Sequence, residues 1–282
     1  MHDNTLYAVL QMGEQYLQEC GIEDASVDAW LLMEYVTGIR RAMFLIERRN
    51  LMKEEDQQRY FELIKKRGTH IPLQHLTGEQ EFMGLTFKVN EHVLVPRQDT
   101  EILVEEALKR VQLGMKVLDM CTGSGCIAVS IAKLAKKNLH VDASDISEDA
   151  LAVAKQNITA LEAEVHLIHS DLFEQITEAY DMIVSNPPYI RTAVIEELAE
   201  EVRIHDPFIA LDGKEDGLYF YRRIVEKSPE YLNAGGYLLF EIGHDQGNDV
   251  KELMCERGFE DVQVYKDLAG LDRVVTGQWN RS

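Results

Sequence analysis

A short apolar run meets a glycine turn in the stretch Val117-Leu118-Asp119-Met120-Cys121-Thr122-Gly123-Ser124-Gly125-Cys126. The run predicts a buried strand at residues 117–120, and the helical spacing after the turn predicts a helix at residues 127–134. Glycines at 123 and 125 let the backbone turn sharply and let a ligand approach it without meeting a Cβ atom. The stretch therefore indicates a ligand site at the end of a strand, although a purely structural turn can have the same glycines.

On both sides of this stretch, from residue 97 onward, short apolar runs alternate with segments of helical spacing. The runs predict strands at residues 117–120, 139–145, 165–169, 181–185, 236–242, 262–265 and 273–276. The helical segments lie at residues 127–134, 147–161, 217–232 and 248–257. This alternation predicts a doubly wound, Rossmann-like α/β sheet whose ligand sites lie at the carboxyl ends of its strands. No clear helix separates the last two strands, which predicts an antiparallel hairpin.

The segment before the α/β pattern, residues 1–78, is predicted to be a small helical domain. Its apolar residues recur at helical spacing in four segments, at residues 6–17, 29–36, 43–46 and 60–64. Short helices of this kind can bury their apolar faces only against one another, which predicts a bundle. A bundle alone indicates no function.

Residues 79–96 are predicted to be a β-hairpin that links the helical domain to the α/β domain at residues 97–282. Apolar positions alternate from Phe82 to Val95, with interruptions at Gly84 and at the polar turn of residues 90–92. Pro96 then ends the pairing, because proline has no N–H to donate to a neighbouring strand.

Composition restricts the class of protein. An apolar share of 45% in 282 residues can build a substantial core. No apolar run approaches the roughly 18 residues that span a bilayer, and the first residues lack the layout of a secretory signal. We therefore expect a cytoplasmic protein without membrane attachment. The four cysteines show no zinc-ligand spacing, and His166 and His169 would lie on opposite faces of a strand, so no metal is expected.

The charge is strongly acidic and unevenly distributed. The chain has 29 Lys and Arg against 49 Asp and Glu, a net charge of −20, of which −15 falls in residues 97–282. An acidic catalytic half repels a phosphate backbone at long range. Nucleic acid as the direct substrate is therefore disfavoured.

The residues at the predicted strand ends favour a sulfonium cofactor over a dinucleotide. A pyrophosphate-binding turn needs three glycines, and cysteine stands at two of those positions, Cys121 and Cys126. Three carboxylates, Asp119, Asp145 and Asp171, are predicted at the ligand side, where they suit a cation and repel a diphosphate. Asp145 can accept hydrogen bonds from ribose hydroxyls, and Asp171 from an adenine amino group. The pattern therefore predicts S-adenosylmethionine, with S-adenosylhomocysteine as the product.

The fourth predicted strand ends in Asn186-Pro187-Pro188-Tyr189, which is suited to holding a planar NH₂ group. Two adjacent prolines stiffen the chain and present carbonyl oxygens with few donors. The Asn186 side-chain oxygen and the Pro187 carbonyl can each accept one substrate hydrogen, and Tyr189 can stack on the planar group. Such a grip aims the nitrogen lone pair at a methyl group without a strong general base. A simple turn is the alternative interpretation.

The chain resembles a known family over nearly its whole length, the PrmC/HemK family of release factor glutamine methyltransferases. The tetrapeptide is typical of amino-group methyltransferases that modify adenine, cytosine or glutamine nitrogen. The residues that carry the resemblance to this branch are 95–101, 119–125, 145–147 with 150–151, 171–173, 184–190, 201–202, 206–207, 210–213, 216–218, 240–243, 246, 266–268 and 272–273.

The resemblance implies transfer of a methyl group to the side-chain nitrogen (N5) of the glutamine in the Gly-Gly-Gln loop of class 1 peptide chain release factors. It implies a class I methyltransferase domain and a helical domain that helps to dock the protein substrate, and we expect a monomer. The expected substrate-binding residues are Asn186, Pro187, Pro188 and Tyr189. The expected cofactor-binding residues are Asp119, Cys121, Thr122, Gly123, Ser124, Gly125, Asp145, Asp171, Leu172 and Asn186.

Two positions depart from the family pattern. Cys121 stands where the family usually has glycine, which crowds the cofactor turn, and Gln98 stands where proline is usual. Neither position belongs to the proposed chemistry.

Two other functions are weighed against the family's: an adenine-N6 nucleic acid methyltransferase, which can share the tetrapeptide, and a non-catalytic binding module.

The sequence also contains features that a protein substrate could use. Basic clusters at 40–41, 48–49 and 65–67 predict a solvated helix face or a docking patch for an acidic partner. The acidic stretch around residues 196–201 is interpreted as a mobile cover over the active site.

Overall fold

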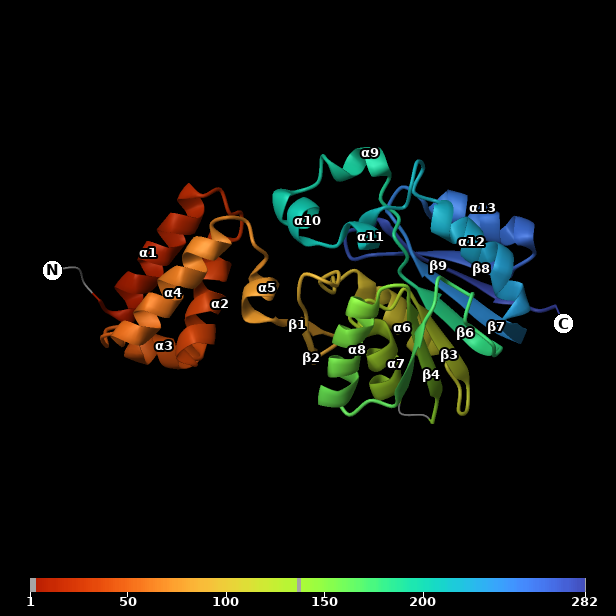
Figure 1. Ribbon diagram of the computed structural model, residues 1–282, viewed down its shortest axis with the longest axis horizontal. Helices are drawn as coiled ribbons and strands as arrows, with labels where there is room; N and C mark the ends of the chain where they lie inside the picture. Colours follow the sequence, from red (N-terminus) through yellow and green to blue (C-terminus); the bar gives the residue numbers. More distant parts are fainter. Residues whose placement is uncertain (1–3, 136–137, 282) are drawn as a thin grey trace. The chain divides into compact units, whose positions relative to one another are not determined.

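The computed structural model describes residues 4–135 and 138–281, and these residues divide into two compact units (Figure 1). The first unit contains the chain up to Gly78 together with residues 200–205, and the second contains residues 79–199 and 206–282. Residues 200–205 lie within the range expected for the α/β domain, yet they group with the helices. No described helix has the length and apolar character needed to cross a bilayer. Residues 1–3, which enter the secretory-signal argument, lie outside the described part.

The helical unit is a bundle with its own core. Its helices are α1 (Leu6–Glu19), α2 (Ala25–Thr37), α3 (Arg41–Glu47), α4 (Glu54–Arg67) and α5 (Leu73–Thr77), together with α10 (Glu200–His205). Thr5 caps α1 by accepting a hydrogen bond from the Ala8 amide, and Gly38 ends α2 in a left-handed conformation. Between the helices, the buried Tyr60 hydroxyl donates to the Ala29 carbonyl at 3.2 Å. The four helical segments predicted from the sequence correspond to α1–α4.

Arg67 joins α10 to the bundle, and its position corrects an expectation. Its Nε donates to Asp28 Oδ2 at 2.6 Å and its Nη2 to Glu201 Oε2 at 2.8 Å. Arg67 is only 6% exposed, so it does not belong to a solvated basic face with Lys65 and Lys66. Burial raises the pKa of Asp28, while the Arg67 guanidinium lowers it. Removing one partner would leave a buried charge uncompensated.

Seven strands form the described sheet of the second unit, in the order β5-β4-β3-β6-β7-β9-β8. They are β3 (Lys116–Met120), β4 (His140–Asp145), β5 (Val165–His169), β6 (Tyr180–Ser185), β7 (Leu232–Glu241), β8 (Glu260–Lys266) and β9 (Asp272–Trp279). The first five are parallel and β9 runs antiparallel between β7 and β8. The doubly wound class and the terminal hairpin are therefore confirmed. The order reverses between β3 and β6, which places a ligand crevice at the carboxyl ends of these strands.

Helices cover both faces of the sheet (Figure 1). One buried cluster packs α6 (Thr100–Arg110) and α7 (Cys126–Leu134) against the sheet, with α8 (Glu148–Ala160) beside them. The other cluster contains α12 (Tyr219–Lys227) and α13 (Gly247–Arg257). The remaining segments are α9 (Thr192–Ile195), α11 (Phe208–Leu211) and the 3₁₀ turn Ser228–Glu230. Helix α6 was not predicted, although Leu103, Val104 and Ala107 give it a buried face.

The hairpin is shorter than predicted, and its turn falls at the first of the two interruptions in the apolar pattern. Its strands are β1 (Glu79–Phe82) and β2 (Leu85–Lys88), with the turn at Met83 and Gly84, both of which have positive φ. Residues 89–95 are not a strand. Val89 and Val93 are nevertheless buried, against Ala150 and Val153 of α8. Their apolar spacing therefore reflects packing against a helix.

Candidate active site

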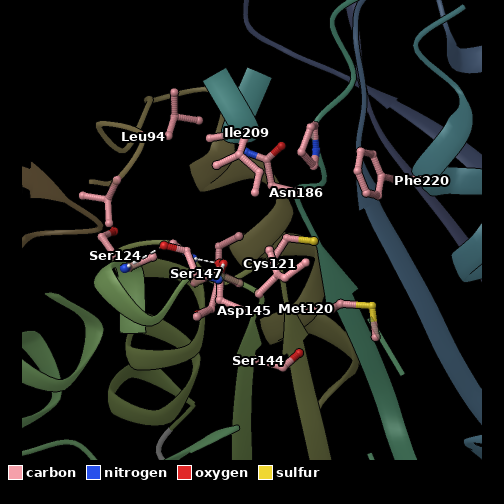
Figure 2. Close-up of a pocket in the computed structure, with 18 of the residues that line it drawn as sticks. Leu94, Met120, Cys121, Ser124, Ser144, Asp145, Ser147, Asn186, Ile209 and Phe220 are labelled. Atoms are coloured by element: carbon pink, nitrogen blue, oxygen red, sulfur yellow. Dashed lines mark hydrogen bonds between the residues drawn. The ribbon is translucent and has the colours of Figure 1, made fainter. Parts of the chain in front are cut away.

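A cavity of about 320 Å³ lies in the second unit at the crevice predicted by the strand order (Figure 2). Residues that follow β3, β4, β5 and β6 contribute to its wall. The expected site residues that line it are Cys121, Thr122, Gly123, Ser124, Asp145, Asp171, Leu172, Asn186 and Pro188. Gly125, Asp119, Pro187 and Tyr189 do not line it, and each has a different position described below.

The glycine turn after β3 has the backbone that the sequence predicted. Gly123 and Gly125 have φ of +54° and +80°. A Cβ at Gly125 would lie 3.2 Å from the Cβ of Ala154, so glycine is needed there for the turn to pack on α8. A Cβ at Gly123 would meet nothing within 4 Å, which leaves open space for a ligand beside the backbone. Cys121 adopts a left-handed φ of +62°, a conformation that glycine takes at lower cost.

Asp145, the last residue of β4, is held by backbone amides at the wall of the cavity (Figure 2). Its Oδ2 accepts from the Gly123 amide and its Oδ1 from the Ser147 amide, each at 2.9 Å. Burial raises the pKa of this carboxyl, while the amide donors lower it. Each carboxylate oxygen has a second lone pair that a ligand hydroxyl could use.

Asp119 does not have the position expected for a cofactor ligand. The strand ends at Met120, and the Asp119 side chain is fully buried beneath the turn. Its Oδ2 accepts from the Thr122 hydroxyl at 2.6 Å and from the Ala128 amide at 3.0 Å. Burial raises the pKa of this carboxyl to about 7. Asp119 therefore shapes the turn and the start of α7 from behind the cavity wall.

Asp171 and Leu172 reach the cavity from the segment after β5. Asp171 Oδ1 accepts from Arg223 Nη1 of α12 at 3.0 Å, so this carboxylate is already paired with a cation. Leu172 is 6% exposed and has a left-handed φ of +49°. Phe220, also from α12, adds an aromatic side chain to the same cavity (Figure 2).

Asn186 follows the end of β6, and its side chain lies at the cavity above Cys121 and Asp145 in the view of Figure 2. Its amide nitrogen Nδ2 donates to the Thr100 hydroxyl at 3.5 Å. The end of β6 is tied to the end of β3, because the Ser185 hydroxyl donates to the Met120 carbonyl at 2.7 Å. Pro187 is buried behind the wall and Pro188 lines the cavity.

Tyr189 has a different environment from the one that its expected stacking role requires. Its hydroxyl donates to Glu241 Oε1 at 3.4 Å, and its carbonyl accepts from Gln246 Nε2 at 3.0 Å. Its half-buried side chain packs against the hydrophobic core cluster that contains α12 and α13 and does not line the cavity. Burial raises its pKa. Here Tyr189 anchors the tetrapeptide, and stacking on a substrate would require the ring to move.

Two polar residues at this end of the cavity were missed by sequence reasoning. Thr100 lines the cavity from the start of α6, and Glu241 ends β7 with its side chain buried. Both stand in segments that carry the family resemblance, but neither has a local spacing that indicates a role. Among the described residues, no group of three or more His, Cys, Asp or Glu could hold a metal ion.

The α/β unit is similar in fold to solved methyltransferases. A methyltransferase from Pyrococcus furiosus matches 70% of this chain and 90% of its own, with a TM-score of 0.54 and 18% identity. A Thermus thermophilus 16S rRNA N2 G1207 methyltransferase, solved with AdoMet and guanosine, matches 71% of this chain and 49% of its own, with a TM-score of 0.52 and 17% identity. At these identities the likeness shows the fold alone.

Sequence comparisons identify the family. Residues 8–78 match the PrmC N-terminal domain, and residues 97–271 match the methyltransferase small domain. A release factor glutamine methyltransferase from Clostridium acetobutylicum is 42% identical over 92% of this chain and 93% of its own length. Another from Geobacter sulfurreducens is 42% identical over 97% of this chain and 96% of its own. The chain therefore belongs to the release factor glutamine methyltransferase family.

Proposed function

We propose that this protein transfers the methyl group of S-adenosylmethionine to the side-chain amide nitrogen of the Gly-Gly-Gln glutamine of class 1 peptide chain release factors. The proposal rests above all on one observation: Asn186 shares a cavity with the Gly123 turn and the Asp145 carboxylate. A cofactor held by the turn would then be next to a side chain that can hold an NH₂ group. The two relatives described above are release factor glutamine methyltransferases, which agrees with this chemistry.

The residues of the turn fit S-adenosylmethionine. The open space beside Gly123 admits a ligand, and Asp145 keeps lone pairs for ribose hydroxyls. The apolar side chains of Leu172 and Phe220 can cover an adenine ring. Bound there, the cofactor supplies an electrophilic methyl group and carries its own leaving group. Asp145, Gly123, Ser124, Thr122, Cys121, Asp171 and Leu172 are the residues that we propose to hold it.

The amide end of the cavity fits a weak nitrogen nucleophile. An amide lone pair is delocalised, so the protein must orient the nitrogen and stabilise its developing positive charge. The Asn186 side-chain oxygen and the Pro187 carbonyl can each accept one amide hydrogen. This grip aims the lone pair and requires no strong general base before transfer.

The helical unit is proposed to bind the release factor. Near the exposed Arg48 and Arg49, three apolar side chains are unusually exposed: Leu45 at 66%, Ile46 at 75% and Leu51 at 76%. Exposed apolar side chains beside basic ones are typical of a protein-binding surface. We further propose that the protein acts as a monomer in the cytoplasm.

One labelling experiment tests the function. The protein is incubated with methyl-labelled S-adenosylmethionine and either a class 1 release factor or duplex DNA, and the label is located by mass spectrometry. We expect label on the glutamine of the Gly-Gly-Gln loop and none on DNA. A release factor with this glutamine changed to alanine is the matched control. Label on adenine, or on neither macromolecule, would overturn the proposal.

A further inference from the structure

We infer that Thr100 and Glu241 are positioning residues that hold the Asn186 side chain with its oxygen toward the substrate nitrogen. This inference rests on the proposed amide methylation. It assigns a role to two buried polar residues that lie far from Asn186 in the sequence. The three come from different elements: the start of α6, the end of β7 and the segment after β6.

The orientation of Asn186 matters because an asparagine amide has a donor side and an acceptor side. If its NH₂ group faced the substrate, it would meet another NH₂ group and could not accept a hydrogen. In the structure Nδ2 is directed at the Thr100 hydroxyl, at 3.5 Å. The carbonyl oxygen is therefore left on the other side of the amide, where it accepts no hydrogen bond from the described residues.

Thr100 can impose this orientation only if its own proton is directed elsewhere. A hydroxyl has one proton, so a threonine that donates to a second acceptor can only accept from Asn186. Thr100 is 2% exposed, which leaves little access for water to compete. We infer that the acceptor is a neighbouring protein group.

We assign this role to Glu241, whose free buried oxygen can accept the Thr100 proton, although the described residues show no formed hydrogen bond between the two. Its carboxyl is buried, and its Oε2 has no hydrogen-bond partner among the described residues. Its Oε1 has a long contact of 3.4 Å with the Tyr189 hydroxyl. The Thr100 hydroxyl is close enough to lower the pKa of this carboxyl as a hydrogen-bond donor does. A charged Glu241 thus attracts the Thr100 proton, and the Thr100 lone pair is left for Asn186.

The surroundings explain why the Glu241 carboxyl retains a free oxygen. The nearby cation, Arg273, pairs with Asp99 and Asp267 at 3.1 Å each, so its charge is shared by other carboxylates. Tyr189 is the residue whose hydroxyl donates to the Glu241 carboxyl in the described part of the chain, and Oε2 is left for the Thr100 proton. A buried acceptor without a full set of donors is costly and has a functional role in many proteins.

We call this arrangement, in which Glu241 accepts the Thr100 proton and Thr100 accepts from Asn186, the relay. Three variants test it: Thr100→Val, Thr100→Ala and Thr100→Ser. Valine keeps the shape but removes the hydroxyl, alanine removes both the hydroxyl and the methyl group, and serine keeps the hydroxyl. We expect kcat for release factor methylation to fall roughly 10- to 100-fold in the valine and alanine variants, the scale for a misoriented reacting group. Serine should restore most of the rate. The KM for S-adenosylmethionine should change little in any variant that folds.

The outcomes separate this inference from the proposed function. If the wild-type protein methylates the release factor but the valine or alanine variant is as fast as the serine variant, the relay is wrong. If serine is as slow as alanine in folded protein, the methyl group or the packing of Thr100 matters rather than its hydroxyl, and the relay is again wrong. If the wild-type protein itself fails to label the release factor glutamine, the proposed function fails first.

Discussion

The two ends of the cavity are built in different ways. At the end that we propose to hold the cofactor, backbone amides donate to both oxygens of Asp145, and the Gly123–Gly125 turn holds its shape through local backbone geometry. At the amide end, Asn186, Thr100 and Glu241 depend on one another, and Glu241 Oε2 has no partner in the described part of the chain. The end that we propose to hold the cofactor is therefore held in place by backbone amides, although Asp119 Oδ1 and Ser144 Oγ also have no partner among the described residues. At the amide end the positions of the side chains depend on side-chain contacts between distant segments.

The largest effect is expected from Asn186→Ala. Without the Asn186 oxygen the substrate nitrogen loses an acceptor that orients it, so transfer should fall by roughly 10²-fold or more. Binding of S-adenosylhomocysteine, measured by calorimetry, should remain within a few-fold of wild type because the cofactor turn is intact. Transfer at the wild-type rate would remove Asn186 from the proposed chemistry.

Asp145→Asn should act on the opposite end. An asparagine has one acceptor oxygen, so it cannot accept from both the Gly123 and Ser147 amides and also serve a ribose hydroxyl. Hydrogen bonds to a charged group are worth about 1.5–3 kcal/mol, which corresponds to a roughly 10- to 100-fold weaker Kd for S-adenosylhomocysteine. The comparison between the two ends would break down if Asp145→Asn lowered kcat at saturating cofactor as much as Asn186→Ala does.

The pH dependence of transfer should report on Glu241. Burial raises the pKa of Glu241 to about 7, and the groups that face it are Asp99, Thr100, Tyr189 and Arg273. The relay requires the charged carboxylate, so kcat should be highest above this pKa and fall by up to about 10-fold as the pH decreases from 8 to 6. Below the pKa the neutral acid can donate to Thr100 and reverse the orientation that Asn186 needs.

The matched variant for this measurement is Glu241→Gln. It removes the titrating group, so its kcat should be lower at pH 8 and nearly flat down to pH 6. Asp119, whose pKa is also raised to about 7, is present in both proteins and serves as an internal check. If kcat of Glu241→Gln still fell between pH 8 and pH 6 as in the wild type, the titration would belong to Asp119 or to another group.

The smallest effect is expected from the helical unit. Replacing the exposed Arg48 and Arg49 by glutamate should raise the KM for the release factor a few-fold, because charges at the rim of an interface mainly affect association. Cofactor binding should be unaffected. The control is the equal charge change at the exposed Lys65 and Lys66, on α4 of the same unit. Equal increases in KM in both variants would indicate a general effect of net charge and no specific docking surface.

The local spacing of apolar residues was sufficient to predict most of the helices and strands of the fold. All seven strands of the sheet were predicted within a few residues. The parallel strands were recognised because buried parallel strands are short apolar runs between glycine or polar segments. The helix α6 was missed, and the hairpin was extended to residue 95. Val89 and Val93 have the spacing of a strand but are buried against α8, and a sequence period does not reveal which partner covers an apolar side chain.

The cofactor end could be predicted from the sequence because it depends on spacing along the chain. A strand, a glycine turn and a carboxylate about 20 residues later are local signals, and they placed Gly123 and Asp145 at the same cavity. Asp119 was misplaced because alternation along β3 directs its side chain beneath the turn. Tyr189 was misplaced because its partner, Glu241, lies 52 residues away.

The amino-acid sequence alone was enough to identify the doubly wound sheet, the glycine turn and the tetrapeptide, because each depends on the order and spacing of neighbouring residues. The tertiary structure was needed to bring Thr100, Asn186 and Glu241 together and to group residues 200–205 with the helical unit through Arg67. These contacts join residues 86 to 141 positions apart along the chain. Contacts between residues so far apart leave no periodic trace in the sequence, so only the folded chain shows which side chains can orient the proposed reacting group.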